Sequence, residues 1–394
     1  MKKTSLALII GSLMLCNAAQ AADVNFSGYG SIRAGLVLGD DHFPRNFNYD
    51  DNIDFKEESL FALQVKTQIN DDWSATIILQ AKGQDDFELE ARWAYLNYEL
   101  TDETTLTLGR FALPYFRNSD TQDIGYAHNY SVMPRSVYRG QAFDVIEGIR
   151  LMHSTFIGDG DITIKGSYGS FSGSTLTALG EVESDINNIM QLSVEYSYDW
   201  FSIYFGALNA ELDLDINSQL DAALMKSLPG YTVKDGTVYN PKPEQLAVYD
   251  MSATYVNEDS ATYLSTGFTI DYQQWLFNAE YVTYKIDDSF SEQNKSMYVS
   301  LGYRFDKTVV TLVHEDVSYN FDYDNVSSAD PYVNAFLTAT NNTFLKPNEY
   351  DAQGIHIRYD ASEGIAYKFE YTYATDKVEG EGASVVTFGI DYVF

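Results

Sequence analysis

The sequence predicts an all-β fold, a sixteen-stranded antiparallel transmembrane β-barrel with an inward-folded third loop. Three observations predict it. Apolar and polar residues alternate along sixteen stretches of the chain, which is the period of a strand with one apolar face. Short turns alternate with long acidic connections, as in barrels that cross a membrane with strands. Between residues 111 and 142 the alternation stops, and so long a loop inside a β-rich chain tends to be functional.

The first residues form a secretory signal peptide, residues 1–21. A basic start, Lys2-Lys3, precedes the apolar run Leu6–Leu15 and the small-x-small cleavage site Ala19-Gln20-Ala21. The apolar run is too short to cross a bilayer as a helix. Because Cys16 leaves with the signal peptide, we expect no thiol or disulfide chemistry in the mature chain.

Composition excludes several classes of protein. The formal net charge is −32, which argues against nucleic acid as a partner because phosphate binding needs basic patches. Hydrophobic residues make up 45% of the chain and aromatic residues 15%, far above the range of disordered chains. A mean hydropathy of −0.24 and the lack of a second long apolar run exclude a helical membrane protein. The 31 tyrosines suit strands and membrane–water interfaces.

The strands follow from the alternation, taken in chain order. Along 24–38 one set of alternate residues is apolar, including Phe26 and Ile32, and the other set is mostly polar, including Ser27 and Arg33. This period-2 pattern indicates a strand with one apolar face. The other predicted strands are 60–69, 73–82, 88–100, 105–110, 143–153, 161–170, 188–198, 200–210, 262–272, 275–284, 295–305, 308–317, 351–360, 365–373 and 383–394.

Connections between these strands alternate in length, and the long ones are acidic. Long loops on one rim and short turns on the other are typical of outer-membrane barrels. Acid pairs in the long loops, such as Asp40-Asp41, either bridge lipopolysaccharide phosphates through divalent cations or are simply solvated. The predicted turns are 70–72, 101–104, 199, 273–274, 306–307 and 361–364, and the predicted loops are 39–58, 171–187, 211–261 and 318–350.

A soluble secreted β-sandwich or propeller is the alternative fold, since the strands of a sandwich also alternate. Two features favour the membrane barrel. Aromatic residues such as Trp73, Trp275 and Tyr303 concentrate at strand ends on the apolar face, where a girdle at the membrane interface is expected. The last strand is apolar on one face and ends in Phe394. The sequence has no repeat of blade length to support a propeller.

The chain resembles the trimeric general diffusion porins of the Gram-negative outer membrane. The resemblance rests on the opening strand FSGYGSIRAG, the segments ARWAYLNYEL and YRGQAFDVIEGIRL, and the terminal strand that ends in Phe394. It implies that residues 22–394 form one barrel domain and that residues 111–142 form a constriction loop inside it. It also implies a homotrimer surrounded by outer-membrane lipid and lipopolysaccharide. Phe394 would be the signal that the barrel assembly machinery reads.

A pore constriction is predicted from the directions of the side chains. If the apolar residues face lipid, the basic residues at alternate positions face the lumen. Acids and bases that meet across a narrow, low-dielectric passage create a transverse field. The alternative is that any residue in a wet lumen must be polar. The predicted constriction comprises Arg33, Lys66, Lys82 and Arg150 by alternation, Arg92 by the resemblance, Arg139 at the loop exit, and the loop acids Asp120 and Asp123. The remaining inward positions are Lys165, Arg304, Arg358, Lys368, Glu195, Glu280 and Glu370.

Two functions follow as hypotheses. The first is an outer-membrane porin, a water-filled channel for passive diffusion of small hydrophilic solutes and ions. The second is a substrate-selective channel with a saturable site for an anionic or sugar solute. An enzyme is not expected, because the sequence lacks the G-x-S-x-G motif of a nucleophile elbow. The five histidines are scattered without paired spacing, so we expect no metal or other cofactor.

Overall fold

The computed structural model describes the chain from residue 23 to residue 394 with internal gaps. The gaps are 40–46, 48, 140–142, 178–179, 216–221, 223–224, 227–229, 235–236, 240–248, 251–255, 288–290, 322–330, 333, 336–348 and 379. The predicted signal peptide 1–21 lies outside the described residues.

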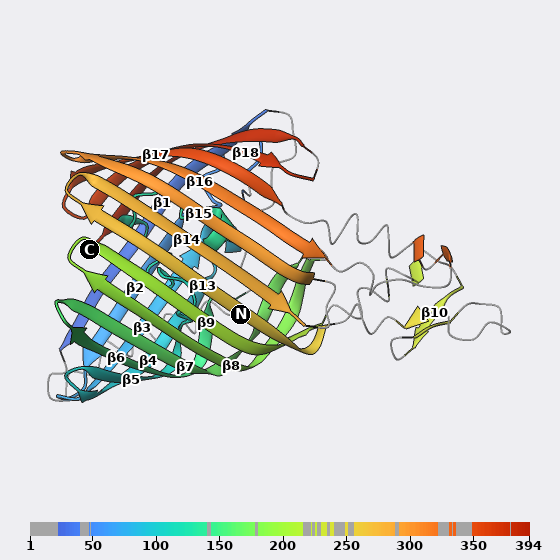
Figure 1. Cartoon of the computed structure of the whole chain (residues 1–394), viewed down its shortest axis with the longest axis horizontal. Helices are drawn as coiled ribbons and strands as arrows, with labels where there is room; N and C mark the ends of the chain where they lie inside the picture. The colour runs from blue at the N-terminus through green and yellow to red at the C-terminus, as the bar shows by residue number, and fades with distance from the viewer. Residues whose placement is uncertain are drawn as a thin grey trace, which may run out of the picture.

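Sixteen strands form one closed antiparallel barrel, which confirms the predicted sixteen-stranded fold. Each barrel strand pairs with the barrel strands before and after it in the chain, and β1 pairs with β19 to close the wall, whose strands run obliquely in Figure 1. The barrel strands are β1 (Val24–Leu38), β2 (Leu60–Gln68), β3 (Trp73–Lys82), β4 (Leu89–Thr101), β5 (Thr104–Ala112), β6 (Val145–Ile157), β7 (Gly160–Thr177), β8 (Gly180–Tyr198), β9 (Phe201–Leu214), β13 (Val256–Tyr272), β14 (Trp275–Ile286), β15 (Ser291–Phe305), β16 (Thr308–Phe321), β17 (Tyr350–Ser362), β18 (Ile365–Asp376) and β19 (Gly382–Val393). A separate small sheet contains β10 (Thr232–Lys234), β11 (Thr237–Tyr239) and β12 (Tyr249–Asp250).

The two faces of the wall differ as the alternation predicts. One face carries large apolar side chains that stay exposed, such as Phe26, Ile77 and Phe388. The opposite face, here called the inner face, carries polar and charged side chains, many of which are buried, such as Arg33 and Glu370. An outer surface this apolar has no stable place in water, so it calls for an apolar surrounding.

Aromatic side chains pair at the end of the barrel that carries the short turns. Trp73 stacks on Tyr98 with ring centroids 4.7 Å apart, and Trp275 meets Tyr303 at 4.8 Å. These residues lie beside the turns that follow β2 and β13 and at the facing ends of β4 and β15. The predicted gathering of aromatic residues at strand ends is therefore present in the wall.

Several strands are longer than the sequence pattern predicts, and the predicted loop 171–187 is wrong. β7 continues to Thr177 and β8 begins at Gly180, so the hairpin occupies most of that stretch. A register shift between Gly169 and Phe171 breaks the alternation there, and the following residues of β7 are mostly serine, glycine and threonine, which show no apolar period. β9 and β13 also extend into the predicted loop 211–261.

The helices that connect barrel strands are short. η2 (Gly83–Asp85) follows β3, while η3 (Gly125–Ala127) and α2 (Arg135–Tyr138) lie between β5 and β6. In the described part of the chain, no helix is long and apolar enough to cross a membrane.

Candidate functional site

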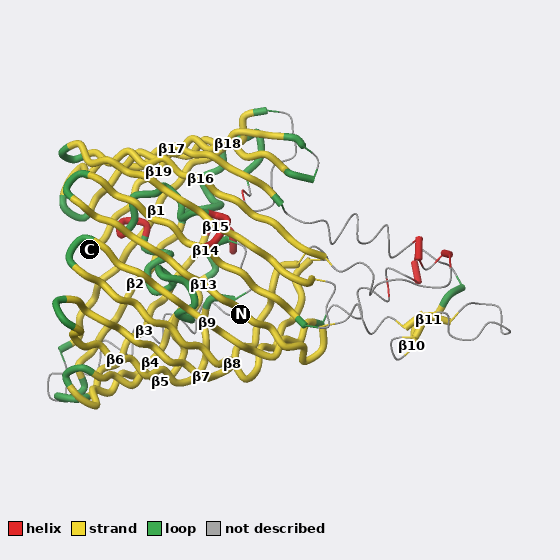
Figure 2. The backbone as a smooth tube through the Cα atoms, in the orientation of Figure 1, coloured by secondary structure: helices red, strands yellow, loops and turns green. Residues whose placement is uncertain are grey.

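The described residues of the connection between β5 and β6, 113–139 and 143–144, pack against the inner face of the wall, and we call them the inner segment. Its hydrogen-bond and ion-pair partners lie on β3, β4, β6–β9 and β13–β19, each at an inner-face position. Figure 2 draws the loops and the two short helices of this segment within the outline of the wall. One segment therefore contacts the inner face around most of the barrel.

An apolar core holds both ends of the inner segment. Phe116 packs edge-on against Tyr138 with ring centroids 5.4 Å apart, and Tyr130 packs edge-on against Tyr298 of β15 at 6.1 Å. The hydroxyl of Tyr138 donates to Glu280 of β14 at 2.6 Å. Buried aromatic rings with bonded hydroxyls fix both position and direction, so the two ends of the segment are held together and against the wall.

Asp120 is shared by two bases of the wall. Its carboxylate lies 2.6 Å from Nζ of Lys165 on β7 and 3.5 Å from Nη1 of Arg150 on β6. Burial by itself raises the pKa of Asp120, but the two cations outweigh it and hold that pKa below its ordinary value. The structure therefore brings Asp120 and Arg150 together, and it adds Lys165.

A second cluster joins the inner segment to β3 and β4. Asp123 lies 3.5 Å from Nζ of Lys82 and 3.4 Å from Nε of Arg92, and it accepts a hydrogen bond from Gln80 at 3.2 Å. Arg92 also forms a two-pronged ion pair with Asp144. Burial raises the pKa of Asp123, yet Lys82 and Arg92 more than reverse this and lower it strongly. A register shift between Ile78 and Leu79, opposite Arg92, explains why its strand does not alternate cleanly.

Arg135 of α2 ties three distant parts of the chain together. Its guanidinium lies 2.6 Å from Glu370 of β18 and 3.1 Å from Glu58, which precedes β2. It also lies over the ring of Phe47 at 4.7 Å. Arg135 is 1% exposed, so its charge depends on these two carboxylates. Arg139 is more exposed, and its Nη2 lies 3.7 Å from the same Glu58.

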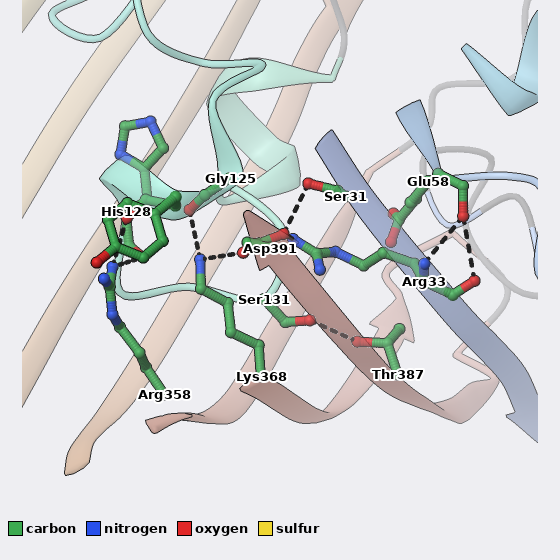
Figure 3. Close-up of polar contacts among 12 residues, drawn as sticks. Ser31, Arg33, Glu58, Gly125, His128, Ser131, Arg358, Lys368, Thr387 and Asp391 are labelled. Atoms are coloured by element: carbon green, nitrogen blue, oxygen red, sulfur yellow. Dashed lines mark hydrogen bonds and ion pairs between the residues drawn. The ribbon is translucent and has the colours of Figure 1, made fainter. Parts of the chain in front are cut away.

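A buried ion cluster fixes the middle of the inner segment to the strands that close the barrel (Figure 3). Asp391 of β19 lies 2.8 Å from both Arg33 of β1 and Lys368 of β18. Lys368 also donates to the carbonyl oxygen of Gly125 at 2.5 Å. Glycine is needed at 125, because a Cβ there would lie 2.5 Å from an Asp391 oxygen and 2.6 Å from the hydroxyl of Ser31. Arg33 is thus paired with a wall acid rather than with the predicted loop acids.

Backbone carbonyls of the inner segment are also bound by Arg358 of β17. Its Nη1 donates to the carbonyl oxygens of Tyr126 at 2.6 Å and His128 at 2.9 Å. The ring of His128 lies 2.8 Å from the carbonyl oxygen of Thr121. Burial lowers the pKa of His128 to about 4, although the Thr121 carbonyl opposes this shift. His128 is therefore neutral at physiological pH.

The two remaining predicted site residues join none of these clusters. Lys66 is exposed on β2. Phe394 is 69% exposed, and its backbone exchanges two hydrogen bonds with Gly28 of β1, at 2.9 and 3.0 Å. Phe394 thus extends the pairing of the first and last strands, whereas Lys66 lies on the wall outside the contacts of the inner segment.

Sequence reasoning missed the acids that pair with several of these bases. Asp391 stands at an inner-face position of a predicted strand, so alternation alone marks it. Asp144 lies in the predicted strand 143–153 at the same alternate positions as Arg150, so alternation marks it too, although β6 itself begins at Val145. Glu58 lies in a predicted loop and carries no signal in the sequence. Glu315, which accepts the backbone N–H of Ser136 at 2.6 Å, also occupies an inner-face position of a predicted strand.

Comparisons with known proteins identify the fold. No family model matches the sequence, and no curated protein matches it. Among solved structures, the anion-selective porin from Comamonas acidovorans is similar with a TM-score of 0.56 at 10% identity, over 95% of this chain and 100% of that one. Outer-membrane expressed OmpT of Vibrio cholerae gives 0.53 at 10% identity, over 95% and 99%. Salmonella typhi OmpF in complex with daunomycin gives 0.51 at 13%, over 95% and 98%. The chain has the fold of these outer-membrane proteins.

Proposed function

We propose that this chain is an outer-membrane porin, a water-filled channel for passive diffusion of small hydrophilic solutes and ions. Its exposed apolar outer surface suits a bilayer, and the polar inner face suits water. The fold it shares with porins supports the same function. Export by a signal peptide of residues 1–21, a homotrimeric state and recognition of Phe394 by the barrel assembly machinery belong to this proposal, as does the lack of a catalytic role.

The observation that carries the proposal is the seating of the inner segment on the inner face. A long loop inside a compact domain is stable only if its polar groups find partners, and here the partners come from strands around most of the wall. Such a segment reduces the open cross-section of the barrel. In this proposal the half-buried charged residues Lys82, Asp120 and Asp123 line the narrowest section.

Conductance of the purified protein in planar bilayers tests the proposal. Deleting residues 120–130 removes the Asp120 and Asp123 contacts and the carbonyl groups that Lys368 and Arg358 bind. We expect the deletion to raise the conductance and the size limit for neutral solutes while the strand content by circular dichroism stays unchanged. Lys285→Gln is the control, because Lys285 is 57% exposed near the rim and should leave conductance unchanged.

A substrate-selective channel is the second candidate, favoured by the crowding of Lys82, Arg92 and Arg139 around Asp123. Such a channel would show a current that one solute blocks at saturating concentration. If every sugar and small carboxylate in a panel blocks the current weakly and to the same extent, the channel has no preferred solute and passive diffusion is supported. If the deletion leaves both conductance and size limit unchanged, the inner segment does not set the passage and the proposal is wrong.

A further inference from the structure

We infer that this pore favours small anions over cations of similar size. The inference rests on the proposed channel function and names the class of solute that the channel prefers. It runs against the net charge of the whole chain, which is −32. The argument depends on how acids and bases are matched on the inner face, and not on their totals.

Two carboxylates at the inner segment are each shared by two bases. Asp120 binds Lys165 and Arg150, and its side chain is 40% exposed, so this cluster is open to water. Asp391 binds Arg33 and Lys368 in a cluster that is closed to water. Each cluster therefore keeps one uncompensated positive charge. The first lies where an ion passes, whereas the second is closed to water and is offset by other buried charges of the inner face, so the inference depends on the first.

The other bases that contact the inner segment or belong to it are each matched by one acid. Lys82 and Arg92 face Asp123 and Asp144, and these pairs leave no surplus. Two further groups are also balanced. In the first, two bases, Arg135 and Arg139, face two acids, Glu58 and Glu370. In the second, Arg117 faces Glu195.

Two further acids of the inner face are covered by the inner segment. Glu280 is 4% exposed and accepts the hydroxyls of Tyr138 and Tyr298 at 2.6 and 2.7 Å. Glu315 is 3% exposed and accepts the backbone N–H of Ser136. An ion in the passage cannot approach either carboxylate closely. Their polar neighbours supply hydrogen bonds in place of water, so both acids act weakly on a passing ion compared with the open cluster at Asp120.

Position decides which charges set the preference of the pore. A narrow passage with low-dielectric walls concentrates the field of the charges that line it. Salt screens the effect of any acid that lies farther from the passage than a Debye length, which is about 10 Å at 0.1 M. The surplus at Asp120 therefore outweighs the acidity of the rest of the chain, and anions are concentrated at the narrowest section.

Reversal potentials across a potassium chloride gradient test the inference on the purified full-length barrel. We expect the unaltered protein to prefer chloride. Lys165→Gln leaves Asp120 with one base and should shift the permeability ratio toward potassium by up to roughly thirtyfold, because one unit charge at about 4 Å in water changes the population of each ion roughly fivefold and in opposite directions. Asp120→Asn leaves two bases without an acid and should shift the ratio toward chloride. The rim variant Lys285→Gln should leave the ratio unchanged.

The possible failures are distinguishable. A folded barrel that conducts but prefers potassium, or a Lys165→Gln pore with an unaltered ratio, overturns the inference and leaves the channel function intact. A folded barrel that conducts no ions at all overturns the proposed function and the inference together. Because Lys165→Gln and Asp120→Asn change the ratio in opposite directions, a general loosening of the segment cannot imitate the result.

Discussion

Replacing Arg135 by alanine should release the inner segment from the wall while leaving the barrel closed. Arg135 is 1% exposed, and its charge faces two carboxylates that are almost as deeply buried. The alanine variant leaves Glu370 without its cation, leaves Glu58 with Arg139 alone, and removes the guanidinium from the ring of Phe47. The strands keep their ladder hydrogen bonds, because Arg135 belongs to none of them.

The size of the effect follows from the burial of the pair. Removing one partner of a buried ion pair costs roughly 3–5 kcal/mol, because the remaining charge stays in a poorly solvating site. About 1.4 kcal/mol is a factor of ten in an equilibrium constant, so the released population should rise roughly 100- to 4,000-fold. Amide hydrogen exchange at residues 130–138 should accelerate by the same factor if exchange follows local opening.

Hydrogen exchange followed by mass spectrometry measures this directly. The control is Arg304→Ala, which removes an exposed pair with Asp271 worth roughly 0–1 kcal/mol and should leave the segment protected. A triple variant that combines Arg135→Met with Glu58→Gln and Glu370→Gln should recover most of the protection, because the two carboxylates that Arg135 neutralised are removed with it. If Arg135→Ala exchanges as slowly as the parent, the buried cluster does not hold the segment and the reasoning is wrong.

Three further predictions test other parts of the structure. Leu63→Lys, on the outer face of β2, should cost roughly 2–4 kcal/mol of unfolding free energy in lipid, whereas the neighbouring inner position Gln64→Lys should be tolerated; equal costs would contradict the assignment of the faces. Deleting Phe394 removes two backbone bonds to Gly28 and should leave unassembled, protease-sensitive chain in cell fractionation; normal assembly would count against it. The pKa of His128 falls from 6.5 to about 4 in the seated segment, so acidification from about pH 6.5 toward 4 should favour the released segment, in which His128 takes up a proton. Exchange of its amides should accelerate over that range in the parent but not in His128→Asn, and an equal response in both would exclude His128 as the cause.

The strands were predictable because the two faces of each strand lie in different environments, one apolar and one polar. Alternation in Val24–Leu38 records an apolar outer side and a polar inner side, and a period of two survives any detail of packing. The pattern failed where the register shifts, as at Gly169–Phe171 in β7, since an extra residue reverses the direction of every later side chain. The pattern also failed where a strand consists mostly of serine, glycine and threonine, because these residues do not alternate between apolar and polar.

The pairing of charges at the candidate site was less predictable than their direction. Alternation assigned Arg33 to the inner face, but its partner Asp391 comes from the far end of the chain and is near it only because β1 pairs with β19. Glu58 lies outside the strands, where no period records a direction. Contacts of this kind depend on closure of the barrel and on the path of the inner segment, and no local pattern in the sequence records either.

The many attachments of the inner segment also have a mechanical consequence. Hydrogen bonds between neighbouring strands fix the strand spacing at about 4.8 Å and hence the circumference of the wall, but they do not prevent a ring of strands from flattening into an ellipse. The inner segment is attached to Lys165 on β7, Glu280 on β14 and Glu370 on β18, so it connects distant parts of the wall and resists this flattening. Lateral pressure from the surrounding bilayer would then compress a braced cylinder rather than a hollow one, and the shape of the opening would stay the same in membranes of different stiffness.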